Sequence, residues 1–189
     1  MKSKTQSIPK ELIYEMDDGT PIYFAGYRDF LSGDKSKEEV MGSSFLQAKL
    51  ISRIVHFLIA GLVKKYIVLS NEVGLQIKKN TWRVLDIAVI DLVKVDEHQA
   101  ANKYLNFPPE LVVEVDTKAA LNELSDPNGY FHAKTDALLG FGVQKVVWVF
   151  THSQKVMIAE PNRSWQIVDW KEEVLLINNL EISIQGLSE

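Results

Sequence analysis

Two short and almost uninterrupted apolar runs, Leu111–Val115 and Lys145–Phe150, restrict most strongly what this chain can fold into. A strand whose successive side chains are nearly all apolar must be covered on both faces. Between the runs, Asp126-Pro127 offers an N-cap and a first-turn proline, and Gly140 and Gly142 mark the end of a helix. The pattern predicts an α/β chain in which helices flank a central mixed sheet.

The first half of the chain supplies further predicted elements. Ser44 followed three residues later by Gln47 forms a capping box, and the helical apolar spacing after it ends near Gly61. Turn residues between apolar runs predict a hairpin from Tyr14–Met16 and Ile22–Phe24. The polar stretch Leu31–Met41 is predicted to be an exposed loop or a frayed turn. A meander of three strands is predicted at Tyr66–Ser70, Val73–Ile77 and Trp82–Ile90.

The composition is that of one ordinary globular domain. The chain has 189 residues, of which 46% are hydrophobic and 24% charged, so we expect a single domain over residues 1–189, with residues 1–13 flexible. It has no cysteine, which excludes disulfides, thiolate zinc sites and a cysteine nucleophile.

The charge and hydropathy patterns limit the cellular setting. No apolar stretch follows the early lysines, and the most apolar segment, Ile54–Val63, is about half the roughly 20 residues that span a membrane. We therefore expect a cytoplasmic protein without membrane contact. The net charge of −4 argues against coating nucleic acid by bulk charge, so any such role needs a local site.

Two carboxylates stand inside strands that otherwise look fully buried. Asp86 interrupts Val84–Ile90, and Glu114 interrupts Leu111–Val115. Burying an ionised carboxylate costs several kcal/mol unless a partner compensates it. For Asp86 the simple alternative to a functional role is an ion pair with Arg83 or another cation.

A lysine and a third carboxylate follow Glu114 at the spacing of a strand. If the extended conformation continues, Glu114, Asp116 and Lys118 project from one face. With Asp86 on a neighbouring strand, the carboxylates of Asp86, Glu114 and Asp116 could hold Mg²⁺, with Mn²⁺ as a substitute. A metal ion and a lysine together favour hydrolysis of a phosphodiester, whereas Asp116 and Lys118 as a solvated pair are the simple alternative.

The order of these residues resembles the PD-(D/E)XK nuclease superfamily and, more closely, the bacterial Uma family of restriction-endonuclease-like proteins. The matching segments are Val84–Val89, Pro109–Val115, Lys134, Phe141–Val143 and Val147–Val149. The resemblance implies a restriction-endonuclease-like α/β fold with a mixed sheet. It also implies that Asp86 and Glu114 are the metal carboxylates and that Lys134, on the second helix, is the catalytic lysine.

Several positions depart from the family pattern. Leu85 replaces the usual proline, Gln47 stands where we expect a histidine, and Asp116-Thr117-Lys118 replaces an apolar residue and a serine. Because Asp116-Thr117-Lys118 itself has the (D/E)XK spacing, Lys118 and Lys134 both remain candidates for the catalytic lysine. A solvent-facing helical lysine is the ordinary alternative for Lys134.

These features together predict a metal-dependent endonuclease that hydrolyses nucleic-acid phosphodiesters, with DNA as the expected substrate. A homodimer would suit the cleavage of two strands. The alternatives are a degenerate nuclease fold that binds nucleic acid or a protein partner without cutting, and a hydrolase of another phosphate ester.

Overall fold

The computed structural model describes residues 8–95, 102–124 and 126–189, so residues 1–7 of the segment expected to be flexible lie outside the described residues. The strands are β1 (Ile13–Asp17), β2 (Thr20–Tyr23), β3 (Tyr66–Lys78), β4 (Thr81–Asp91), β5 (Leu111–Val115), β6 (Lys145–Phe150), β7 (Lys155–Ala159), β8 (Gln166–Asp169), β9 (Val174–Ile177) and β10 (Leu180–Ile182). The helices are α1 (Tyr27–Ser32), α2 (Lys37–Met41), α3 (Phe45–Gly61), α4 (Pro127–Phe141) and α5 (Ile184–Ser188). Short 3₁₀ turns occupy Lys10–Leu12, Leu92–Lys94 and Leu121–Glu123.

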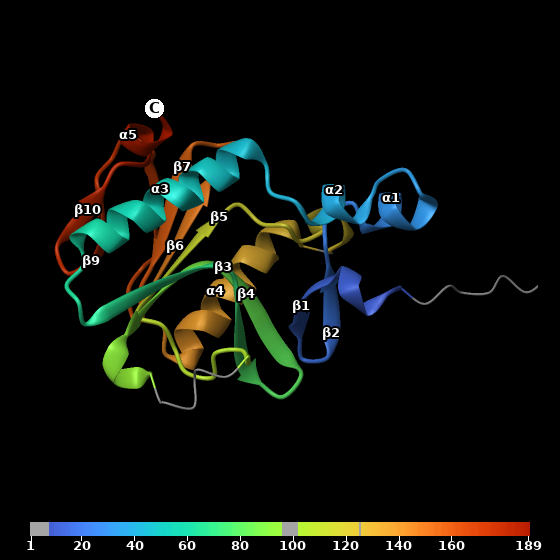
Figure 1. Ribbon diagram of the computed structural model, residues 1–189, viewed down its shortest axis with the longest axis horizontal. Coiled ribbons are helices and arrows are strands. Elements are labelled where there is room, and N and C mark those ends of the chain that lie inside the picture. The colour runs from blue at the N-terminus through green and yellow to red at the C-terminus, as the bar shows by residue number, and fades with distance from the viewer. Residues whose placement is uncertain (1–7, 96–101, 125) are drawn as a thin grey trace, which may run out of the picture.

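A mixed sheet organises the molecule. Among the described residues, eight strands join in the order β2-β1-β4-β5-β6-β7-β8, and β3 pairs with β4 in addition. The neighbours β5 and β6 are parallel, whereas β4 runs antiparallel to both β3 and β5. Helix α4 connects β5 to β6 and lies on one face of the sheet, and α3 crosses the other (Figure 1). This arrangement confirms the predicted α/β class.

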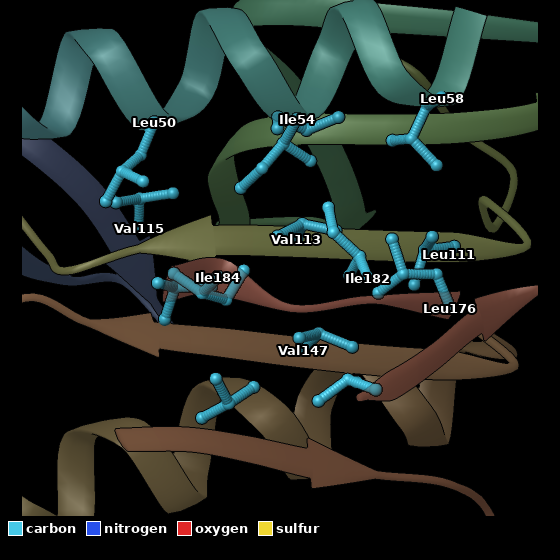
Figure 2. Packing of buried hydrophobic residues seen from close by; sticks show 14 of the residues in the cluster. Leu50, Ile54, Leu58, Leu111, Val113, Val115, Val147, Leu176, Ile182 and Ile184 are labelled. Carbon is cyan, nitrogen blue, oxygen red and sulfur yellow. The ribbon is translucent and has the colours of Figure 1, made fainter. Parts of the chain in front are cut away.

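The apolar core has two layers because the central strands are covered on both faces. On one face, Ile54 of α3 packs with Val113 and Val147 (Figure 2). On the opposite face, Val112 packs in a cluster that includes Leu138 of α4. Successive residues of β5 therefore serve opposite layers, as its continuous apolar run requires. Within the described part of the chain, no helix is both long and apolar enough to cross a lipid bilayer.

The segment Leu31–Met41 is helical over much of its length, and its prediction as an exposed loop or a frayed turn was wrong. Helix α1 extends to Ser32, and α2 begins at Lys37 behind a capping box in which Ser36 and Glu39 each accept a hydrogen bond from the other's backbone N–H. A high density of polar and charged residues concealed these short helices, whose side chains are mostly exposed.

The predicted meander is a long hairpin of two strands. Strand β3 runs through both predicted segments and pairs with β4 along its length, with a register shift between Ser70 and Val73. Asn71 and Glu72, which suggested a turn, form a β-bulge inside this strand. Both residues have left-handed backbone conformations, with φ of 75° and 59°.

Strand β4 carries a fork in the sheet. Opposite β3, it pairs with β1 near Trp82, where Met16 is the partner, and with β5 over Ile87–Val89. Two different strands thus share this edge of β4, and Val84 lies in the gap between them. The candidate site is built around this fork.

Candidate active site

Side chains replace the missing backbone partner at the fork. The Val84 N–H donates to Glu15 Oε1 at 3.0 Å, and the Val84 carbonyl accepts from Lys134 Nζ at 2.7 Å. Buried backbone polar groups are almost always paired, so a gap between two strands needs such substitutes. Glu15 from β1 and Lys134 from α4 therefore complete the hydrogen bonding of β4.

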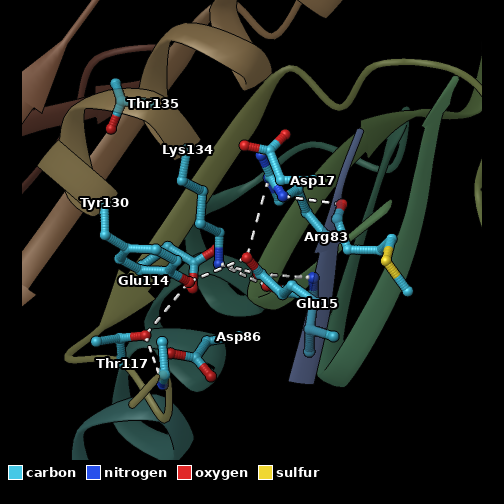
Figure 3. A network of polar contacts seen from close by, with 12 residues as sticks. Glu15, Asp17, Arg83, Asp86, Glu114, Thr117, Tyr130, Lys134 and Thr135 are labelled. Carbon is cyan, nitrogen blue, oxygen red and sulfur yellow. Dashed lines mark hydrogen bonds and ion pairs between the residues drawn. The ribbon is translucent and has the colours of Figure 1, made fainter. Parts of the chain in front are cut away.

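The same side chains form a buried ion network (Figure 3). Lys134 Nζ lies 2.8 Å from Glu15 Oε1 and 3.1 Å from Glu114 Oε1, and all three side chains are at most 1% exposed. The Tyr130 hydroxyl donates to Glu15 Oε2 at 3.0 Å. The alternative of a solvent-facing Lys134 is therefore wrong: α4 turns this lysine into the core, where two carboxylates compensate it.

Burial and charge oppose each other in this network. Desolvation raises the pKa of Glu114 well above its usual value, although the neighbouring Lys134 acts in the opposite direction. For Lys134, desolvation lowers the pKa, but Glu114 and Glu15 outweigh it and the net pKa is raised. Glu114 Oε1 is buried, and among the described residues its contact with Lys134 lacks hydrogen-bond geometry.

Arg83 lies on β4, and its side chain binds residues of β1 rather than Asp86. Its guanidinium donates to the Met16 carbonyl at 3.0 Å and to Asp17 Oδ1 at 2.8 Å, and Nε lies 3.9 Å from Glu15 Oε2. Among the described residues no ion pair joins Arg83 to Asp86, so Arg83 is not the partner of this carboxylate; the charges of Lys134 and Lys118 are the cationic influences on it.

Asp86 is held by the end of β5. Its Oδ2 accepts the Val115 N–H at 2.8 Å, and the Val115 carbonyl accepts from Gln47 Nε2 at 2.7 Å. Burial raises the pKa of Asp86, and the Val115 hydrogen bond opposes this rise. Gln47 was predicted to serve a capping box; Ser44 does accept its N–H at 3.2 Å, but the Gln47 side chain reaches across to β5 instead.

Asp86 and Lys118 face a common cavity of about 380 Å³ between α3 and the bulge of β3. Ser43, Ala48, Ile51, Ser52, Val55, Ser70, Asn71 and Glu72 complete its lining. Lys118 donates to the Met41 carbonyl at 3.1 Å and forms an ion pair with Glu72. Hydroxyls, an amide, carboxylates and an ammonium thus share the lining of this cavity with the apolar side chains of Ala48, Ile51 and Val55.

Asp116 points elsewhere because the chain leaves the extended conformation at that residue. Its φ is 58°, so the alternation that would align it with Glu114 and Lys118 ends at Val115. The carboxylate accepts the Thr151 N–H at 2.8 Å and the Thr151 hydroxyl at 2.6 Å. The structure thus brings together Asp86 and Glu114 but commits Asp116 to the end of β6.

The side chains that could act as ligands of the predicted Mg²⁺ ion are Asp86 and Glu114. In the described part of the chain, no group of three or more His, Cys, Asp or Glu side chains is arranged to hold a metal. Asp86 and Glu114 are nevertheless close enough that the charge of Asp86 raises the pKa of Glu114. Mg²⁺ commonly binds through one or two carboxylates and completes its shell with water and phosphate oxygens. Asp86 lines the cavity, whereas Glu114 is buried against Lys134 and is not part of the lining. As oxygen donors the two carboxylates match such a half-open site in chemical type, but not a cage made of protein alone.

Sequence reasoning missed Glu15, and it weighed Glu72 as a further ligand or general base but favoured a turn residue. Glu15 stands between Tyr14 and Met16, a charge inside an apolar strand, which is the signal that singled out Asp86 and Glu114. Glu72 was interpreted as a residue of a turn, whereas it lies in a bulge and lines the cavity.

The fold and the fork define a mixed-sheet α/β architecture with a buried lysine–carboxylate network. A solved structure from Anabaena variabilis, described as a "putative nuclease belonging to DUF820", is similar over 92% of this chain and 88% of that chain, with a TM-score of 0.68 and 15% identity. At this identity the likeness establishes a shared fold. No family model matches the chain, and no curated protein matches its sequence.

Proposed function

We propose that the protein is a metal-dependent endonuclease that hydrolyses phosphodiester bonds of nucleic acid, with DNA as the expected substrate. The observation that carries the proposal is the placement of Asp86 and Lys118 on one cavity, with the buried Glu114 electrostatically coupled to Asp86. The fold shared with a structure described as a nuclease supports it.

The residues divide into those that meet the substrate and those that support them. Asp86 and Glu114 would hold Mg²⁺, or Mn²⁺ in its place. Such an ion lowers the pKa of a bound water and polarises the phosphate. Lys118 lies on the cavity and can neutralise charge on the phosphodiester, whereas Lys134 is bonded to Val84, Glu15 and Glu114 and holds Glu114 in place.

Metal binding and cleavage test the proposal together. Calorimetric titration with Mn²⁺ and cleavage of end-labelled DNA with Mg²⁺ should both succeed with the natural protein. Asp86→Asn should remove detectable Mn²⁺ binding and lower cleavage on the order of 10²-fold, because it deletes a ligand while keeping an acceptor for Val115. Glu114→Gln should act alike, with circular dichroism verifying its fold.

Glu160→Gln is the matched control. Glu160 forms ion pairs with Lys145 and Arg163 away from the cavity, so its loss should leave both readouts unchanged. Absence of Mn²⁺ binding and of cleavage in the natural protein would overturn the proposal.

A second candidate function is nucleic-acid or protein binding without cleavage. The observation that favours it is the close internal engagement of Lys134, Glu15 and Glu114. DNA binding that persists in EDTA, accompanied by no cleavage with Mg²⁺ or Mn²⁺, would identify this function instead.

We also propose that two copies associate, since two sites suit the cleavage of a duplex. Exposed apolar side chains gather where α3 ends, β3 begins and β4 ends, and such patches are typical of interfaces. They are Ile59, Val63, Ile67, Leu92, Val93 and Val95. Sedimentation equilibrium at micromolar protein should give the mass of a dimer, and a monomer mass would contradict this part of the proposal.

A further inference from the structure

The bulge of β3 lies directly opposite Asp86. Ser70 pairs with Ile87 and Val73 pairs with Leu85, so two residues, Asn71 and Glu72, stand across from Asp86 alone. Bulges often occur beside active sites because they re-aim a side chain without ending the strand. Here the bulge brings Glu72 to the lining of the cavity that Asp86 faces.

The backbone of the bulge is unusual for its residue types. Asn71 and Glu72 have φ of 75° and 59°, a left-handed region that non-glycine residues seldom occupy. Asparagine tolerates this region, but glutamate has no local hydrogen bond that favours it. Strained conformations of this kind concentrate at functional sites, where the surrounding structure maintains them.

Glu72 and the Met41 carbonyl together hold the Lys118 ammonium. Lys118 follows β5 on a loop, yet its side chain is only 12% exposed, while that of Glu72 is 43% exposed. A lysine side chain loses considerable rotamer freedom when it is fixed, so a carboxylate that fixes it in advance removes that loss from a later binding step. The pair also acts on Asp86, whose pKa Lys118 lowers and Glu72 raises.

We propose that Glu72 is a positioning residue of this site: its carboxylate holds the Lys118 ammonium in the cavity, and a phosphate oxygen of the nucleic acid takes that ammonium from Glu72 when substrate enters. The inference rests on the proposed function for the substrate, whereas the hold of Glu72 on Lys118 is independent of catalysis. Glu72 can turn to solvent when the phosphate replaces it, because 43% of its side chain is already exposed.

Competitive acylation of lysine amines, quantified by peptide mass spectrometry, tests the hold directly. In Glu72→Gln, Lys118 should be acylated about five-fold faster than in the natural protein, which corresponds to losing one ion pair. Glu72→Asp should restore most of the protection because the carboxylate remains. Lys155, which pairs with Asp169 on the surface, is the internal control and should react equally in all three proteins.

An unchanged Lys118 rate in Glu72→Gln, with an unchanged melting temperature, would overturn the inference, since Met41 and packing would then account for the protection. Single-stranded DNA of 20 nucleotides in EDTA should protect Lys118 in Glu72→Gln, and failure to do so would overturn the exchange with phosphate.

Cleavage kinetics separate this inference from the proposed function. If the natural protein cleaves DNA, Glu72→Gln should lower kcat/KM about 10-fold, because Lys118 must then lose its rotamer freedom while the substrate binds. If the natural protein does not cleave DNA but Lys118 responds to Glu72→Gln, the endonuclease proposal fails while the hold of Glu72 on Lys118 stands.

Discussion

The Asp86 side chain both accepts a hydrogen bond from β5 and lines the cavity. The donor of this hydrogen bond is the Val115 N–H, and the acceptor is Oδ2. Desolvation penalises the charged carboxylate more than the Val115 hydrogen bond and the Lys134 charge favour it, so the pKa of Asp86 is raised. The folded protein consequently binds a proton at Asp86 more tightly than the unfolded chain does.

This raised pKa fixes the sign of a pH dependence. The stability contributed by protonated Asp86 is complete below its unfolded pKa and is lost as the pH rises through the higher folded pKa. Asparagine cannot ionise, so Asp86→Asn should be more stable than the natural protein at pH 8, by about 1 kcal/mol, and the difference should shrink toward pH 4. Urea unfolding followed by tryptophan fluorescence measures it.

Asp169→Asn supplies a control of opposite sign. The hydrogen bond from Lys155 lowers the pKa of Asp169, so its stabilising contribution is present above the unfolded pKa and is lost as the pH falls. This variant should be the less stable one near neutral pH. A pH-independent stability difference for Asp86→Asn would contradict the assignment of a raised pKa.

Single residues were predictable from the sequence where the surrounding pattern was unambiguous. Asp86 and Glu114 stood out because apolar residues surround them on strands with no exposed face. Glu15 carries the same signal in a terminal hairpin, where alternation with solvent makes a charge ordinary. The role of Gln47 depends on the approach of α3 to β5, which no local pattern encodes.

Helices and strands were predictable where their signals are local in the sequence, and not where they depend on pairing with a distant segment. The strands β5 and β6 and the helices α3 and α4 agree with their predicted segments because caps and apolar runs are local signals. The bulge of β3 could not be predicted in this way. Asn-Glu between two apolar runs is typical of a turn, and only pairing with β4 across both runs makes it a bulge.

The end of α4 offers a prediction with a matched pair of glycines. Gly142 is the C-cap of the helix, with φ of 114°, and an added Cβ would lie 3.1 Å from the Pro108 side chain. Gly142→Ala should therefore lower the free energy of unfolding by about 1–3 kcal/mol. Gly140 lies inside the helix, and an added Cβ there would meet no atom within 4 Å apart from its chain neighbours and the helix's own backbone. Gly140→Ala should therefore raise the free energy of unfolding by about 0.5–1 kcal/mol. Thermal unfolding of both variants should give shifts of opposite sign, and equal signs would contradict this account of the helix end.

At the scale of the whole molecule, the charge distribution favours contact with a single phosphate of nucleic acid over contact with many phosphates along the backbone. The net charge is −4, and Lys118 is the one cation among the described residues that line the cavity. Proteins that track a phosphate backbone release many counterions, whereas a single phosphate contact releases about one.

The salt dependence of DNA binding should reflect this difference. Fluorescence anisotropy with a labelled oligonucleotide in EDTA should give a slope of log K against log salt of about −1, and Lys118→Met should bring it close to zero. A slope of about −4 or steeper would instead reveal an extended basic surface.

The site at the fork of β4 can form only after all the segments that contribute to it have been synthesised. Strand β1 is synthesised early, yet it must wait for β4, and the hydrogen bond from Tyr130 to Glu15 spans 115 residues of sequence. Contacts between such distant residues require the closure of a long loop, which slows folding. A chain still on the ribosome and shorter than α4 lacks Lys134, so Glu114 has no ammonium beside it. The lysine–carboxylate network is thus complete only after α4 has been made and packed on the sheet.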